Sequence, residues 1–139
     1  MAGSYLGGTM ASREDLESFI ARLDADISSE EVDPGIWVLA PGEDNAPVVV
    51  SLDPPVVVFR AKVMDMPEPG QKKTGLMQKL LELNAAGLMH GSYGIEGSHV
   101  VLTDALQLEN LDFNEFQASI DSITLALASH IPALAAFQE

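Results

Sequence analysis

The sequence predicts an α+β fold with the element order α-β-β-β-α-β-β-α, in which an antiparallel sheet packs against helices. Amphipathic helical patterns lie near both ends of the chain. Between them, short apolar segments are separated by turns rich in proline and glycine, and most of these turns are too short for the crossover that parallel strands need. A chain of 139 residues forms one domain with its own core, which we place at residues 12–139.

The first helix is predicted over residues 13–28. Ser12, followed three residues later by Asp15, is typical of a capped helix N-terminus. Apolar side chains then recur at helical spacing at Leu16, Phe19, Ile20, Leu23 and Ile27. The turn Val32-Asp33-Pro34-Gly35 separates this helix from the strands that follow.

The segment before the helix, residues 1–11, lacks the basic and apolar regions of a signal peptide. We expect it to be a flexible tail or a cloning remnant, with Met10 as an alternative start. It is left out of the predicted domain.

Three closely spaced strands are predicted at residues 36–40, 48–52 and 56–64, so an antiparallel meander is expected. The third strand alternates, and its two faces differ in polarity. One face carries Val57, Phe59, Ala61 and Val63, and the other carries Val56, Val58, Arg60 and Lys62.

The second helix is predicted over residues 71–89. One stripe of it consists of Met77, Leu80, Leu81, Asn84 and Leu88. Asn84 therefore lies on an apolar face, where a buried amide must find hydrogen-bond partners. The nearest possible hydrogen-bond partners are the end of the helix and the backbone of the hairpin that follows.

A two-stranded hairpin follows the second helix. Tyr93 and Ile95 alternate with small or polar residues, Gly97-Ser98 forms a compact turn, and Val100 and Leu102 continue on the return strand.

The last helix begins after Asp112, and Glu115 completes a reciprocal cap. Its apolar stripe, broken only by His130, consists of Phe113, Phe116, Ile120, Ile123, Leu127, Leu134 and Phe137. The opposite face has no charge beyond Asp121, which predicts burial on two sides. Pro132 is expected to kink or end the helix. We expect no transmembrane span, because residues 123–137 are short and interrupted by polar residues and proline.

The charge balance excludes several classes of partner. The chain has 7 basic and 21 acidic residues, a formal net charge of −14. Such a chain repels nucleic-acid phosphates and anionic membrane surfaces, so we expect neither as a partner. The charge either keeps the protein soluble or attracts a basic protein. The absence of cysteine excludes disulfides and thiolate metal sites and fits a reducing compartment such as the cytoplasm.

No catalytic pattern is present, so we expect a protein that is not an enzyme, with no catalytic residue, metal or cofactor. His90, His99 and His130 lack metal-ligand spacing. The glycines between Gly91 and Gly97 lead into a strand and lack the lysine of a phosphate loop. A small-molecule site remains an alternative if His130, Asn84 and Tyr93 converge in a pocket under the last helix.

Several segments resemble the type III secretion chaperone fold of the Tir chaperone family and the related YbjN-like proteins. The similar pattern covers about residues 12–137. The residues that carry it are Leu80-Leu81-Glu82-Leu83-Asn84-Ala85, Tyr93-Gly94-Ile95, Val100-Val101-Leu102, Leu106-Gln107-Leu108 and Leu111-Asp112.

The resemblance implies a cytoplasmic homodimer, without enzymatic activity, that binds an extended segment of a partner protein such as a secreted effector. The alternative within the same fold is a YbjN-like regulatory protein outside any secretion system, which a genomic neighbourhood without secretion genes would favour.

The resemblance also implies two kinds of binding surface. For the partner, the candidates are Val56 and Val58, with Phe19 and Leu23 as alternatives if they are not wholly in the core. For the dimer interface, which the resemblance places on the second helix and neighbouring strands, the candidates are Met77, Leu81, Leu88, Tyr93 and Ile95.

Overall fold

A computed structural model of the chain describes residues 9–42 and 46–139. Its helices are α1 (Arg13–Ala21), α2 (Gln71–Ala86) and α3 (Phe113–Leu134), and a 3₁₀ turn η1 (Ala135–Phe137) extends α3. Its strands are β1 (Ser28–Asp33), β2 (Ile36–Ala40), β3 (Val48–Asp53), β4 (Val56–Asp65), β5 (Ser92–Glu96) and β6 (His99–Gln107).

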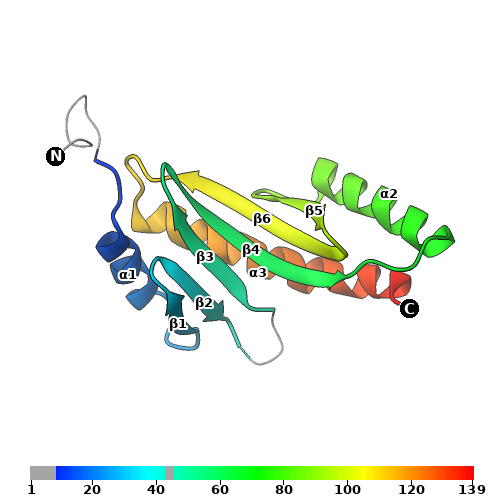
Figure 1. Ribbon diagram of the computed structural model, residues 1–139, viewed down its shortest axis with the longest axis horizontal. Helices are drawn as coiled ribbons and strands as arrows, with labels where there is room; N and C mark the ends of the chain where they lie inside the picture. The colour runs from blue at the N-terminus through cyan, green and yellow to red at the C-terminus, as the bar shows by residue number, and fades with distance from the viewer. Residues whose placement is uncertain (1–8, 43–45) are drawn as a thin grey trace.

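Within the described residues, the strands form one six-stranded antiparallel sheet in the order β1-β2-β3-β4-β6-β5. Helix α3 crosses one face of this sheet, α1 lies near its β1 end, and α2 lies beside β5 (Figure 1). The predicted α+β class and antiparallel sheet are therefore confirmed. The core lies between sheet and α3, where Phe59 and Phe116 are fully buried with ring centroids 5.4 Å apart.

The sequence interpretation missed β1 and extended the first helix to residue 28, whereas α1 ends at Ala21. Leu23 and Ile27 still pack on the core, but from two short turns after the helix, so their helical spacing is coincidental. In β1 only Glu31 is not exposed, so the strand has no apolar alternation of its own.

Strand β1 forms because β2 supplies its partner through a tight turn at Asp33-Pro34-Gly35. Gly35 has φ of 76°, in the left-handed region that favours glycine, and its carbonyl accepts a 2.8 Å hydrogen bond from the Leu52 N–H. Because this strand forms by pairing with β2, the sequence of residues 28–33 alone does not predict it.

The predicted alternation of β4 is wrong at its end. The register between β4 and β6 shifts between Lys62 and Met64, which marks a β-bulge. The extra residue turns Met64 to the core, where it is 6% exposed, and leaves Val63 half-buried. The other inward positions, Val57, Phe59 and Ala61, are fully buried as predicted.

The N-terminal caps of α1 and α3 agree with the sequence prediction, whereas the C-terminal ends of α2 and α3 differ from it. Ser12 with Asp15 and Asp112 with Glu115 both form reciprocal capping boxes. Helix α2 ends at Ala86, before the predicted residue 89. Helix α3 continues through Pro132 for two more residues and then tightens into η1.

The expected tail of residues 1–11 is only partly described. Residues 1–8 lie outside the described residues. The remainder is not free, because Met10 pairs with Glu109 in an antiparallel bridge and the Ala11 N–H donates a 2.9 Å hydrogen bond to the Leu108 carbonyl. Ala11 is 9% exposed and belongs to the core, so this part of the expectation is corrected.

By length and composition, Phe113–Phe137 is apolar enough to cross a membrane, with a mean hydropathy of 1.4 over its best window. The sequence expectation that this segment is too short does not hold, since the helix continues through its polar residues. Its inward stripe nevertheless packs on the sheet, with Phe116, Ile120 and Ile123 buried, as in the core helix of a globular domain.

Candidate functional site

Figure 1 shows the sheet in front of α3. The face of the sheet that points away from α3 carries an apolar patch, called here the open face. It consists of Ile36, Val38, Val49, Val56 and Val58, all half-buried. The strand register brings them together: Val38 lies opposite Val49, and Ser51 lies between Ile36 and Val58. Directly opposite residues have Cβ atoms about 5 Å apart and diagonal ones are about 7–8 Å apart, so the five cluster on this face around Ser51.

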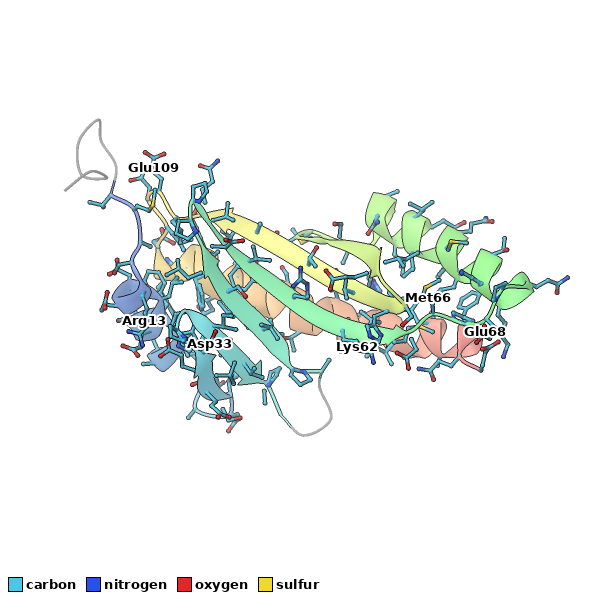
Figure 2. All side chains as sticks on the ribbon, viewed as in Figure 1. Arg13, Asp33, Lys62, Met66, Glu68 and Glu109 are labelled. Carbon is cyan, nitrogen blue, oxygen red and sulfur yellow. The ribbon has the colours of Figure 1, made fainter. Side chains whose placement is uncertain are left out.

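Beyond Val58, β4 carries charged groups on the same side of the sheet. Arg60 forms an ion pair with Glu96 at 3.2 Å. Lys62, which is labelled in Figure 2, forms one with Asp65 at 2.9 Å. Hydrogen bonds from Lys62 and His99 hold the pKa of Asp65 below its usual value. This end of the face is therefore polar and internally paired, which limits the open face to the half nearer β2 and β3.

At the other end of the sheet, Arg13 holds β1 against α1. Its Nε donates to Glu31 Oε2 at 2.8 Å and its Nη2 donates to Oε1 at 2.5 Å, a bidentate pair. The Gly35 N–H also donates to Glu31 at 2.9 Å. The hydrogen bonds from Arg13 and Gly35 lower the pKa of Glu31, and Glu31 raises the pKa of Arg13. The outer edge of β1 beside this pair, including Val32, is exposed.

The four partner-binding candidates predicted from the sequence do not share a surface. Val56 and Val58 lie on the open face. Phe19 packs its ring 5.6 Å from Phe116 on the helix side of the sheet, and Leu23 is 8% exposed in the core. Phe19 and Leu23 thus stabilise the domain and face away from the open face.

Most of the dimer candidates do share a surface, called here the α2–β5 surface, formed by Met77, Leu81 and Ile95. Their exposed fractions are 37%, 69% and 49%. A shallow hollow of about 460 Å³ beside them is lined in part by Met77, Ile95 and Lys73. Leu88, two residues beyond the end of α2, is partly buried, whereas Tyr93 is only 5% exposed and points into the domain.

Asn84, Tyr93 and His130 form one hydrogen-bond network, as the small-molecule alternative requires. The Asn84 amide donates to the Tyr93 carbonyl at 3.1 Å and accepts from the Tyr93 N–H at 2.7 Å. The Tyr93 hydroxyl lies 2.7 Å from His130 Nδ1. The three residues therefore satisfy one another, and the network locks α2, β5 and α3 together and offers these bonds to no ligand.

Burial governs the titration of this network. It raises the pKa of Tyr93 to about 12. It also lowers the pKa of His130, with a smaller contribution from the charge of Lys79, while the Gly87 backbone opposes the shift. The neutral forms are favoured in both residues. Among the described residues, no group of three or more His, Cys, Asp or Glu is placed to hold a metal.

Three members of the open face were not predicted from the sequence: Ile36, Val38 and Val49. Strands β2 and β3 are apolar on both faces, so alternation alone does not separate Trp37 and Leu39, which are buried, from their neighbours. The available signal was residue type, since the outward positions of β2 and β3 are β-branched or small whereas the inward positions of β2 are Trp and Leu.

Residues 10–139 match the family model CesT_Tir_1, the type III secretion chaperone family. The chain belongs to this family. A search of curated protein sequences finds no match. The resemblance read from the sequence is therefore confirmed at the level of the family.

Two solved structures share the family fold with this chain. One is a chain of the heterodimeric ExoU–SpcU complex from the type III secretion system of Pseudomonas aeruginosa, with a TM-score of 0.61, 15% identity, and coverage of 74% of this chain and 85% of that chain. The other is YbjN from E. coli, with a TM-score of 0.62, 15% identity, and coverage of 86% and 90%. At this identity the likeness concerns the fold alone.

Proposed function

We propose that this protein is a binding scaffold, without enzymatic activity, that holds an extended segment of a partner protein against the open face of its sheet. Membership of a secretion chaperone family supports a protein-binding role. The observation that carries the proposal is the cluster of half-buried apolar side chains of Ile36, Val38, Val49, Val56 and Val58 on the face opposite α3. Apolar side chains gathered on a face that no other element covers are typical of interaction sites.

The shape of the open face favours an extended segment. A pleated sheet surface suits a chain in extended conformation, which presents every second side chain to it. The exposed edge of β1 adjoins the same face and leaves backbone groups for pairing. A segment on this face would gain mainly hydrophobic contacts, at about 25 cal/mol per Å² of apolar area removed from water.

The proposed partner is a secreted effector, by analogy with the ExoU–SpcU complex, and the proposed location is the cytoplasm. The YbjN-like regulatory role remains the second candidate, because the TM-scores of the two structures, 0.61 and 0.62, do not separate them. An effector or secretion gene beside the coding gene would favour the first role, and its absence would favour the second.

We further propose that the protein is a homodimer and that its interface includes the α2–β5 surface. Exposed Met77, Leu81 and Ile95 support this placement. Leu88, predicted for the same interface, is partly buried against the core and lines a hollow beside α3. Tyr93 supports this interface indirectly, because the hydrogen bonds between its backbone and Asn84 hold β5 against α2. Replacement of Leu81 by Glu is expected to shift the protein toward monomer in sedimentation velocity.

The binding proposal is tested by capture from native lysate with wild type, Val58→Glu and Asn114→Glu, followed by quantitative mass spectrometry. Asn114 is exposed near the start of α3, which packs on the other face of the sheet, so N114E makes a matched change in charge away from the open face. A protein retained by wild type and N114E but lost with V58E supports the proposal. Equal recovery with V58E would contradict the open face as the site, and Val58→Thr, which keeps the shape, separates lost binding from lost stability.

A further inference from the structure

Three carboxylates lie on the open face, each directly opposite one of its apolar residues. The register pairs are Glu30 with Val38, Asp33 with Ile36, and Asp53 with Val56. Directly opposite residues of an antiparallel pair project from the same face of the sheet, with Cβ atoms about 5 Å apart. All three carboxylates are exposed, and Figure 2 labels Asp33 near β1 and β2. The open face therefore has an acidic rim, which consists of Glu30, Asp33 and Asp53.

The acidic rim is not neutralised by the part of the chain that the structure describes. None of its three side chains forms an ion pair with, or accepts a hydrogen bond from, another described residue. Residues 23–59, which include β1, β2 and β3, contain eight Asp or Glu and no Lys, Arg or His. The cations on the same side of β4, Arg60 and Lys62, already form ion pairs. The open face thus presents unpaired negative charge beside its apolar residues.

The acidic rim lies close enough to act on a bound segment, unlike most of the net charge of −14. The Debye length is about 8 Å at physiological ionic strength, so charges farther than this from a bound segment are largely screened. Carboxylates whose Cβ atoms lie about 5 Å from the apolar side chains are within that range. The remaining charge of the chain contributes mainly to its solubility.

A basic extended segment complements both features of the open face. Its apolar side chains repeat on one face about every 7 Å, so they can contact the valines of the open face. A lysine or arginine can lay its aliphatic stem along the same valines and place its charged end beside a carboxylate. Opposite charges across an interface speed association, whereas like charges disfavour the wrong partner. An acidic segment of equal hydrophobicity would therefore bind less well.

Protection of the sheet edge accounts for only part of the acidic rim. Charged side chains on an edge strand discourage indiscriminate pairing with other chains. Glu30 and Asp33 fit that role, since β1 is the outermost strand at its end of the sheet. Asp53 does not, because β3 has a paired strand on each side. The feature that all three carboxylates share is their place beside the apolar residues of the open face.

We propose that the segment bound by the open face is basic, an inference that rests on the function proposed above. Its apolar side chains alternate along an extended chain and contact the valines. Lysine or arginine residues flank these apolar residues and pair with Glu30, Asp33 and Asp53. The apolar contacts supply most of the buried area, and the acidic rim selects basic segments from among apolar ones.

The test is a selection from a displayed library of random peptides of about 12 residues, which span about 40 Å when extended. The purified full chain is used in four forms: wild type, a rim variant (E30Q, D33N and D53N), a control variant (E82Q, D121N and E139Q) and an apolar variant (V38T and V58T). The control variant removes as many carboxylates as the rim variant, from exposed positions on α2, on α3 and at the C-terminus. Circular dichroism confirms that all forms fold.

We expect wild type and the control variant to enrich peptides in which apolar residues alternate and Lys and Arg outnumber Asp and Glu. The rim variant should keep the apolar alternation and lose the excess of Lys and Arg. An excess that is absent in wild type, or equal in the rim and control variants, would overturn the basic segment while the apolar binding mode stands. If no enriched peptide depends on Val38 and Val58, the function proposed for the open face fails, and the basic segment fails with it.

The affinity of the peptide most enriched by wild type gives a second, quantitative readout. An exposed charge pair accounts for at most about five-fold in affinity, so three pairs together are expected to account for about ten-fold. Fluorescence anisotropy should therefore show a Kd about ten-fold higher for the rim variant than for the control variant at low ionic strength. This difference should shrink as salt is added, because exposed charges are screened. Equal Kd values for the two variants at low ionic strength would overturn the proposal.

Discussion

Replacement of Asn84 by Ala is expected to destabilise the domain by about 2 kcal/mol. Asn84 satisfies both backbone groups of Tyr93, through bonds of 3.1 and 2.7 Å, and Tyr93 itself is 5% exposed. Each bond contributes about 0.5–1.5 kcal/mol net, and a buried group that loses its partner costs about 1–3 kcal/mol. Because Asn84 is half-buried, water can replace part of the lost hydrogen bonding. The expected loss of stability therefore lies near the lower end of the range that these contributions span.

The assay is urea unfolding followed by circular dichroism at one fixed protein concentration, because self-association couples to stability. Gln78→Ala is the matched control on the same helix. Gln78 donates one exposed 3.1 Å hydrogen bond to Glu82, a pair that contributes about 0.2–0.5 kcal/mol. If the free energies of unfolding of N84A and Q78A agreed within 0.5 kcal/mol, the inference that Asn84 stabilises the packing of β5 against α2 would be refuted.

Three further predictions concern titration. Because the folded pKa of His130 is lowered, the unfolded chain binds more protons, so wild type should lose stability relative to His130→Gln as pH falls through about 6.5; a constant difference would contradict this. Because the pKa of Tyr93 is raised to about 12, wild type should lose stability relative to Tyr93→Phe as pH rises from about 10 toward that value, and parallel alkaline unfolding curves would refute it. Because the pKa of Glu31 is lowered, its contribution should be present above about pH 4.5 and lost in acid, so wild type and Glu31→Gln should converge in stability as pH falls; a gap that persists would show that the Arg13 pair does not titrate as described.

The sequence predicted those parts of the fold whose signals are local. Capping residues at Ser12 and Asp112, the apolar stripe of α3 and the alternation at the start of β4 each require only a few neighbouring residues. The partners of Asn84 were also anticipated, because a polar residue in an apolar stripe next to a hairpin has few choices.

The parts that were missed depend on pairing between distant segments. Strand β1 has almost no pattern of its own and exists because β2 lies beside it, and the bulge that turns Met64 inward is set by the register with β6. The candidate site was found only in part for the same reason. Val56 and Val58 alternate with buried residues, whereas the contribution of Val38 and Val49 appears only once β2 and β3 are paired.

Binding of an extended partner segment by the open face is tested most directly by photo-crosslinking in the native cell. A photoreactive amino acid is placed at Val49 or Val58, and at Asn114 on α3 as a control on the other side of the sheet. We expect adducts from Val49 and Val58 that map to one contiguous stretch of a single partner protein, and none from Asn114. Adducts from Asn114 alone, or adducts from Val49 and Val58 scattered over a folded partner surface, would contradict this binding mode.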